Sequence, residues 1–318
     1  MQHQNQSLYS AFVARGIYPL ALTGIILIFV GFFLIAQSVS GQLLPHDVKS
    51  LGMSTAQLAF FNEGRVLRFM FHDRVAFGGS LISVGLLYIW LAVFPLKEGK
   101  AWAWWVFIIS GISGFGSFLT YLGYGYLDSW HAMGTLLLIP LYLTGLYYSY
   151  HSITSPKTIR TLFVKQADTS FTKFGIGNAL LLFTSAGIFL GGVTIMVVGM
   201  TSVFVPQDLG YMQIKVCGLT QFNSKLIPII AHDRASFGGG LATTGAMFFF
   251  SIWCSKASRH LWEILALAIS IGFLSAIGVH FWIRYLDVWH IAPAYFGLSV
   301  FCIGLCLSYT GMVKKNHL

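Results

Sequence analysis

The stretch HDRVAFGG at residues 72–79 returns as HDRASFGG at residues 232–239, 160 positions later. A second stretch, YLDSWH at residues 126–131, returns as YLDVWH at residues 285–290, 159 positions later. Two motifs in the same order and at nearly the same spacing indicate a tandem duplication. Their charged and imidazole groups lie in an otherwise apolar chain, where such groups are costly unless they are paired or functional. We therefore expect the motifs to form a site.

The composition of the chain limits its class. Of 318 residues, 56% are hydrophobic and 9% are charged, and the mean hydropathy is +0.73. Soluble domains carry about 25% charged residues, so we predict an integral membrane protein in contact with the lipid bilayer. The net charge of +9 is spread over short loops. Nucleic-acid binding would require a basic stripe instead, and we expect no nucleic-acid partner.

Membrane spans follow from the apolar runs. About 20 apolar residues are needed to cross a bilayer core of about 30 Å. The first run is too long for the core of a signal peptide and has a counterpart in the second half, so we expect a span rather than a cleaved leader. The fold class predicted is an all-α integral membrane protein with eight transmembrane helices. The expected spans are 18–38, 75–96, 102–125, 131–150, 176–200, 235–254, 262–285 and 290–311.

The spans also predict domains and orientation. We expect a four-helix membrane repeat at residues 1–150, a cytoplasmic linker at 151–174 and a second four-helix repeat at 175–318. An even number of spans in each repeat makes the two repeats parallel, related by a pseudo-two-fold axis along the membrane normal. Lys and Arg residues in short loops are more numerous on the side of the two termini. We predict that both termini are cytoplasmic, in a plasma (inner) membrane.

This topology gathers the motifs at one membrane face. The two HDR triplets are expected to open the second and sixth spans. The two YLDxWH motifs are expected to connect the third span to the fourth and the seventh span to the eighth. All four motifs then lie on the non-cytoplasmic side. Four histidines and four aspartates are expected to converge there in one polar site.

The spacing within the second motif favours metal binding. Asp128 and His131 are three residues apart, as are Asp287 and His290, so at helical spacing each pair shares a face. Di-iron four-helix bundles present a carboxylate and an imidazole to their metals at this spacing. Such a set suits Fe, Mn or Zn, and histidines in pairs also suit haem as axial ligands. The predicted metal ligands are His72, His131, His232, His290, Asp128 and Asp287.

A purely structural role explains the same residues. Asp128 and Asp287 precede the fourth and eighth spans, where a carboxylate caps a helix N-terminus. The aspartate of each HDR triplet has the adjacent arginine available as a counter-ion. The Phe-Gly-Gly segments that follow would let neighbouring helices approach closely. His280, on the seventh span, is expected to be a hydrogen-bonded packing residue.

The duplicated HDRxxFGG and YLDxWH motifs resemble a poorly characterised family of bacterial multi-pass membrane proteins. The resemblance covers both halves of the chain. It implies a bacterial membrane protein, and it brings no activity with it.

The function expected from these residues is a membrane-embedded, metal- or haem-dependent redox protein. Its substrate would be lipid-soluble, such as a quinone or an acyl lipid, and would react at the outer face. Asp73 and Asp233 would be catalytic, with Arg74 and Arg234 orienting them or holding an anionic head group. A transporter or proton-coupled carrier using the same residues is the first alternative. A structural or assembly subunit is the second.

The orientation can be tested with reporters and a thiol reagent. Reporters that are active only in the cytoplasm should be active when fused after His151 and at the C-terminus, because the basic loops lie on that side. Cys217, in the link between the fifth and sixth spans, should react with a membrane-impermeant thiol reagent added from outside. Labelling of Cys217 only after the membrane is opened would contradict the predicted orientation.

Overall fold

The computed structural model describes residues 16–314, and every regular element in that range is a helix. Eight helical spans are long and apolar enough to cross a membrane, which confirms the predicted all-α class and span number. The predicted domain ends at residues 1–15 and 315–318 lie outside the described residues. The spans are built on α2 (Ile17–Val39), α5 (Arg65–Leu91), α6 (Ala101–Ser117), α8 (Ser129–His151), α9 (Lys173–Met200), α12 (Leu226–Cys254), α13 (Arg259–Ile283) and α14 (Val288–Tyr309).

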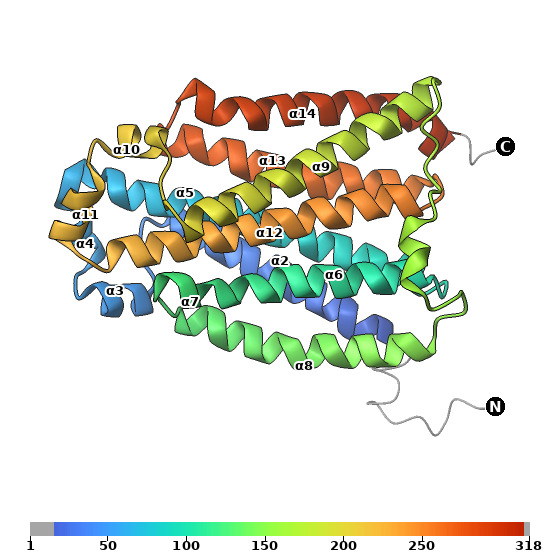
Figure 1. The fold of residues 1–318 in the computed structure, drawn as a ribbon, viewed down its shortest axis with the longest axis horizontal. Helices are drawn as coiled ribbons and strands as arrows, with labels where there is room; N and C mark the ends of the chain where they lie inside the picture. The colour runs from blue at the N-terminus through green and yellow to red at the C-terminus, as the bar shows by residue number, and fades with distance from the viewer. Residues whose placement is uncertain (1–15, 315–318) are drawn as a thin grey trace.

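Short helices cover one end of the bundle and continue some of the spans. The α3, α4, α10 and α11 helices lie together at the end opposite to the start of α2 (Figure 1). Proline occupies the first turn of both α3 and α10, where its missing N–H costs nothing. The short elements are α3 (Pro45–Leu51), α4 (Thr55–Phe60), η2 (Phe61–Gly64), η3 (Ala92–Leu96), η4 (Phe118–Thr120), α7 (Tyr121–Tyr124), η5 (Ile159–Phe163), α10 (Pro206–Met212), α11 (Val216–Phe222) and η6 (Thr310–Lys314).

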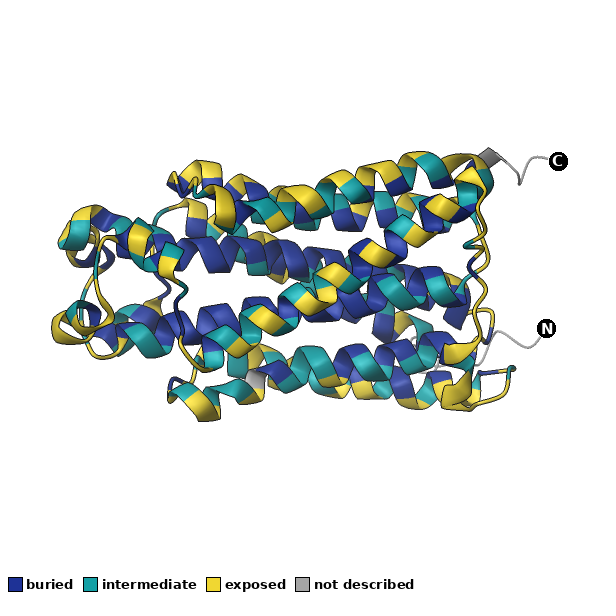
Figure 2. Cartoon of the chain, turned by 45° about the horizontal axis from the view of Figure 1, so that its top comes forward, coloured by how far each residue is buried: buried dark blue, intermediate teal, exposed yellow. Residues whose placement is uncertain are grey.

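The second and sixth spans form the centre of the bundle. In the most apolar part of these spans, 67% and 78% of the residues are buried, against 22–39% in the other six. The α5 and α12 helices pack against each other, and the remaining spans surround them (Figure 2). The polar HDR motifs are carried by these two helices. Their charged groups therefore lie inside protein rather than against lipid.

The glycines after each HDR triplet bring neighbouring helices into backbone contact. A Cβ built at Gly78 would lie 2.7 Å from the carbonyl oxygen of Gly31 on α2. A Cβ built at Gly238 would lie 2.7 Å from the carbonyl oxygen of Gly192 on α9. No real side chain fits at such distances. The prediction that these segments permit close helix approach is confirmed.

The HDR triplets do not open their spans, and this prediction was wrong. The α5 helix begins at Arg65 and α12 begins at Leu226, so both triplets lie well inside a helix. The physical reason is that the residues before each triplet are also apolar and find a partner. Phe69 and Ile229, for example, are fully buried in a cluster shared with the short helices at this end. The helices therefore extend beyond the predicted start to bury this surface.

Candidate functional site

Two buried ion pairs cross between the central helices. The Nε of Arg74 donates to Oδ2 of Asp233 at 2.8 Å, and the Nε of Arg234 donates to Oδ2 of Asp73 at 3.3 Å. Each arginine thus pairs with the aspartate of the other triplet. The expectation that adjacent residues form the pair was wrong, because neighbours in a helix sequence point to different sides of it.

A second aspartate completes the coordination of each arginine. Nη1 of Arg74 donates to Oδ2 of Asp47 at 2.6 Å, and Nη1 of Arg234 donates to Oδ2 of Asp208 at 2.5 Å. Asp47 and Asp208 lie in the first turns of α3 and α10 and are completely buried. Each guanidinium therefore lies between two carboxylates. With formal charges, each group of one arginine and two aspartates carries −1.

Tyrosines of the YLDxWH motifs hold these same aspartates. The hydroxyl of Tyr126 donates to Oδ1 of Asp47 at 2.9 Å, and that of Tyr285 donates to Oδ1 of Asp208 at 2.9 Å. Burial and the nearby carboxylate raise the pKa of both tyrosines, so they remain neutral donors. The two motifs that recur in the sequence are thus joined through aspartates that belong to neither.

Both aspartates of the YLDxWH motifs cap helices. The side chain of Asp128 accepts hydrogen bonds from the backbone N–H groups of Trp130 and His131 at 2.8 and 3.0 Å. The side chain of Asp287 accepts from the N–H of His290 at 2.8 Å. The N-cap interpretation of both residues is confirmed. Their predicted role as metal ligands stays a prediction.

Asp128 also belongs to a histidine cluster whose members come from both halves of the chain. Its Oδ1 lies 3.0 Å from Nε2 of His46, and its Oδ2 lies 3.5 Å from Nε2 of His232. The hydroxyl of Tyr124 lies 3.0 Å from Nδ1 of His232, and the His131 ring lies 5.3 Å from the His232 ring. The structure thus brings His131 and His232 together, as expected from the sequence, and adds His46 to them.

His46 and Asp128 form an ion pair outside the spans. Burial would raise the pKa of Asp128, but the hydrogen bonds from His232 and His46 outweigh it, and the pKa lies well below its usual 3.8. Burial would lower the pKa of His46, but the hydrogen bond and charge of Asp128 raise it above its usual 6.5. Both shifts favour the charged forms.

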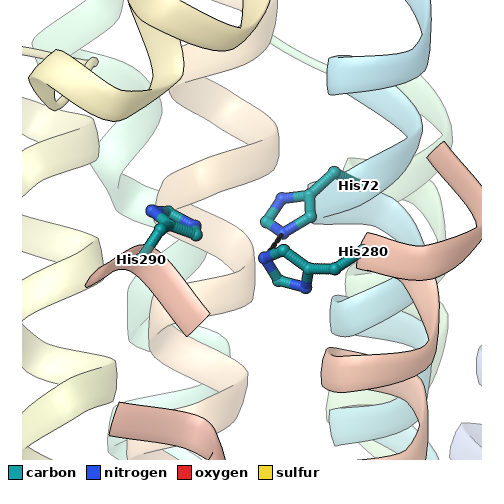
Figure 3. A group of neighbouring side chains, drawn as sticks. All are labelled: His72, His280 and His290. Atoms are coloured by element: carbon teal, nitrogen blue, oxygen red, sulfur yellow. Dashed lines mark hydrogen bonds between the residues drawn. The ribbon is translucent and has the colours of Figure 1, made fainter. Parts of the chain in front are cut away.

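A second cluster consists of three histidines from three helices. His72 on α5, His280 near the end of α13 and His290 in the first turn of α14 each offer a ring nitrogen, and these nitrogens lie within 4.8 Å of one another. Figure 3 shows His290 facing the other two from the opposite side. The Tyr285 ring stacks on His290 at 4.6 Å. The structure thus joins two predicted ligands, His72 and His290, to His280.

The hydrogen bonds of two of these histidines set their tautomers. Nδ1 of His72 lies 2.9 Å from Oδ1 of Asp73, and Nδ1 of His280 lies 2.7 Å from the carbonyl oxygen of Ala276. Carboxylate and carbonyl oxygens only accept hydrogen bonds, so each Nδ1 carries the proton. The two Nε2 atoms face each other at 3.1 Å. In the neutral rings both are lone pairs, and two lone pairs repel unless a cation lies between them.

An apolar cavity begins at this cluster. Its volume is about 540 Å³, and residues of α5, α9, α12, α13 and α14 line it. His72, His280 and His290 are among the lining residues, together with Asp73 and Arg234. The remaining lining is mostly aliphatic or aromatic. This combination of a large apolar lining with a few convergent polar groups is typical of a ligand-binding site.

Sequence reasoning did not assign four residues to the site: Asp47, Asp208, His46 and His280. Asp47 and Asp208 lie in the long links between spans, although Pro-x-Asp occurs at residues 45–47 and again at 206–208, which was a usable signal. His46 stands between that proline and aspartate. His280 is buried and hydrogen-bonded to the carbonyl of Ala276, as expected of a packing residue, but its contact with His72 and His290 was not expected.

No family model, curated protein or solved structure matches the chain.

The crossed pairing can be tested with double variants. Arg74→Met should destabilise the protein by about 3–5 kcal/mol, because it leaves buried carboxylates unpaired. Adding Asp233→Leu, which removes the Nε partner, should recover much of that loss. Adding Asp73→Leu instead should lower stability further, because it also removes one of the two carboxylate partners of Arg234. Thermal unfolding of the purified variants in detergent measures this, and equal recovery by both second changes would contradict the crossed pairs.

The ion pair of His46 and Asp128 makes stability depend on pH. A raised histidine pKa gives stabilisation that is complete below the unfolded value and is lost as the pH rises through the folded value. A lowered aspartate pKa gives stabilisation that is lost only in acid. We expect wild type to exceed His46→Gln in unfolding temperature at about pH 5.5, and the difference to shrink by about pH 9.

Two features sharpen this pH experiment. Glutamine is the residue that follows the corresponding proline, at position 207, so the substitution is compatible with this type of turn. His151→Gln, at an exposed position on the opposite end of α8, should show no such pH trend. A constant difference between wild type and His46→Gln across this range would show that the histidine acts only by packing.

Proposed function

We propose that the protein is a membrane-embedded metal protein in which His72, His280 and His290 bind one ion beside the apolar cavity. The ion would serve redox chemistry on a lipid-soluble substrate. The observation that carries this proposal is the pair of Nε2 atoms that face each other at 3.1 Å while both Nδ1 atoms are engaged, which makes both Nε2 atoms lone-pair donors in the neutral rings. A metal ion accepts both lone pairs at once.

The surroundings of the histidines support a metal ion. Histidines that bind metals nearly always donate their other N–H to a carboxylate or a backbone carbonyl, and Asp73 and Ala276 supply one of each. Asp73 and Asp208 share a single arginine, Arg234, so this side of the site has a formal charge of −1. A buried negative charge without compensation is costly, and a bound cation would neutralise it.

The donor set narrows the choice of ion. Imidazole ligands suit Zn, Cu, Fe and Ni, whereas Mn prefers oxygen ligands. Catalytic sites commonly use three protein ligands and keep one position open. Zinc has no redox chemistry, so iron is the better candidate among the expected metals for a redox role. Bonds of about 2.1 Å place the nitrogens of a tetrahedral site about 3.4 Å apart, so their widest separation, within 4.8 Å, has to contract by no more than about 1.4 Å.

A haem held between two of these histidines is less compatible with the geometry. Axial ligands on opposite sides of an iron would place their nitrogens about 4 Å apart, with the macrocycle between them. The Nε2 atoms of His72 and His280 lie 3.1 Å apart and leave no room for that plane. A single ion therefore fits better than a haem held between His72 and His280.

We further propose that the chain consists of two parallel four-helix repeats related by a pseudo-two-fold axis. Its support is the exchange of partners between the triplets: Arg74 with Asp233, and Arg234 with Asp73. Contacts within each half also correspond, as in the two tyrosine–aspartate bonds. With both termini cytoplasmic, the metal site would lie near the outer face.

A proton-coupled carrier is the second candidate. One proton shared by the two facing Nε2 atoms would also remove their repulsion, and it would also supply the missing positive charge. The cavity would then hold a transported solute instead of a substrate. The two candidates differ in what the purified protein contains, because only the first retains a metal ion.

Metal content tests the proposal. Protein purified without chelators should contain about one equivalent of a transition metal, measured by elemental analysis. His72→Ala and His280→Tyr should weaken binding by more than the about 10–100-fold that loss of an outer partner costs. Tyrosine is the residue found at position 121, which is the counterpart of 280 in the first half. His131→Ala, in the other cluster, is the matched control and should retain the metal.

The outcomes separate the candidates. Wild-type protein without stoichiometric metal would refute the metal proposal and favour proton coupling. Equal loss of metal in His131→Ala and His72→Ala, with the metal retained in His280→Tyr, would instead support the four-histidine site expected from the sequence.

A further inference from the structure

The cavity lies where two outer helices separate. Near the start of α9, Gly177 is packed against the backbone of α14 at Gly304 and Ser308. Toward its other end, α9 packs instead against α12, where Gly192 meets Gly238 and Ala242. Figure 1 shows α9 and α14 meeting at one end of the bundle and diverging toward the other. The diverging end is the one that carries the three histidines.

The cavity is open between these two helices. Phe183 on α9 and Phe296 on α14 line it, yet they are 58% and 61% exposed on the outside of the bundle. Their rings meet nearly at right angles, 6.3 Å apart. A Cβ built at Gly187, also in the lining, would meet nothing within 4 Å. The opening lies between the spans, where it would face the hydrocarbon of a bilayer.

In the first half of the chain, the surface between α2 and α8, which matches the opening between α9 and α14, is covered by an aromatic contact. Phe33 on α2 stacks on Trp130 of α8, with ring centroids 6.4 Å apart. Thr194, which is 161 residues after Phe33, lines the cavity and is exposed. Trp289, which is 159 residues after Trp130, is 79% exposed. Because Thr194 stands where Phe33 would be, no aromatic pair of this kind among the described residues covers the opening between α9 and α14.

The cavity is long and its polarity is confined to one end. Its lining on α14 runs from His290 to Val300, which corresponds to about 15 Å of helix. Its lining on α5, from His72 to Ser83, has nearly the same length. Hydroxyl groups in the lining, such as those of Ser83 and Thr184, donate to helix carbonyls and offer little polarity. Charged and imidazole groups occur only at the histidine end.

We propose that this cavity takes one hydrocarbon chain of a membrane lipid, which enters sideways from the bilayer between α9 and α14. The chain lies along the helices, and its polar group is directed toward His72, His280 and His290. This deepens the proposed function by naming the class of substrate and its entrance, and it rests on that function only for the reaction of the polar group. A hydrocarbon chain is the occupant that matches an elongated apolar slot facing lipid.

Photolabelling of the full-length protein tests the entrance. The probe is stearic acid with a diazirine on its chain, added to protein in phospholipid nanodiscs, and labelled peptides are identified by mass spectrometry. We expect labelling to be strongest on residues 183–198 and 290–300. Thr194→Phe, which restores the aromatic group found at position 33, should reduce it to the level seen on the outer surface of α8. Gly187→Leu, at the open glycine, should do the same.

Matched controls use exposed positions elsewhere. Gly134→Leu on α8, where an added Cβ also meets nothing within 4 Å, should leave labelling of α9 and α14 unchanged. Competition with unlabelled isoprenoid quinone or with unlabelled fatty acid identifies the source of the chain: whichever competes is the class that the cavity accepts. Uniform labelling of all lipid-facing helices, unchanged labelling in Thr194→Phe, or competition by neither compound would overturn the proposal.

Metal analysis of the same samples distinguishes the two proposals. Thr194→Phe should retain the metal, because it closes the entrance without touching a histidine. Labelled protein without metal would leave the lipid site standing and remove the metal centre. Protein with metal but without specific labelling would leave the metal centre standing and remove the lipid site.

Discussion

Each of the two central helices carries an arginine that finds its carboxylate on the other helix. Burying these charges is tolerable only because every guanidinium lies between two carboxylates at hydrogen-bond distance. The need to pair these arginines also fixes the position of elements outside the two central helices. One carboxylate of each pair comes from α3 or α10, so the short helices at this end are held in place by the same charges that hold α5 and α12 together.

The crossed pairs also determine which histidine neighbours which group. Asp73 accepts from Arg234 through Oδ2 and faces His72 through Oδ1, so the arginine and the histidine are held by one carboxylate. The tautomer of His72 therefore depends on the pairing of the central helices. The facing Nε2 atoms, on which the proposed metal site rests, are a consequence of this arrangement and of the carbonyl group behind His280.

The two clusters differ although the motifs that build them are nearly the same. In the first half, His46 and Asp128 form an ion pair and the Phe33–Trp130 contact covers the neighbouring surface. At the matching positions of the proposed second repeat, Gln207 stands in place of His46, His280 in place of Tyr121 and Thr194 in place of Phe33. Two of these differences bear on the second cluster: His280 joins His72 and His290 there, and Thr194 leaves the cavity without an aromatic cover. A chemical role confined to the second cluster, as proposed, would explain why these replacements occur together.

The sequence by itself determined the eight spans and the two aspartate caps, because both depend on residues close together in the chain. It also supplied most of the polar residues of the two clusters. Only the tertiary structure decided their pairing. His72 and His280 are 208 residues apart, and Arg74 reaches an aspartate 159 residues away. Such partners depend on how each helix is rotated against its neighbours. The spacing of residues along one helix does not determine how that helix is rotated against another.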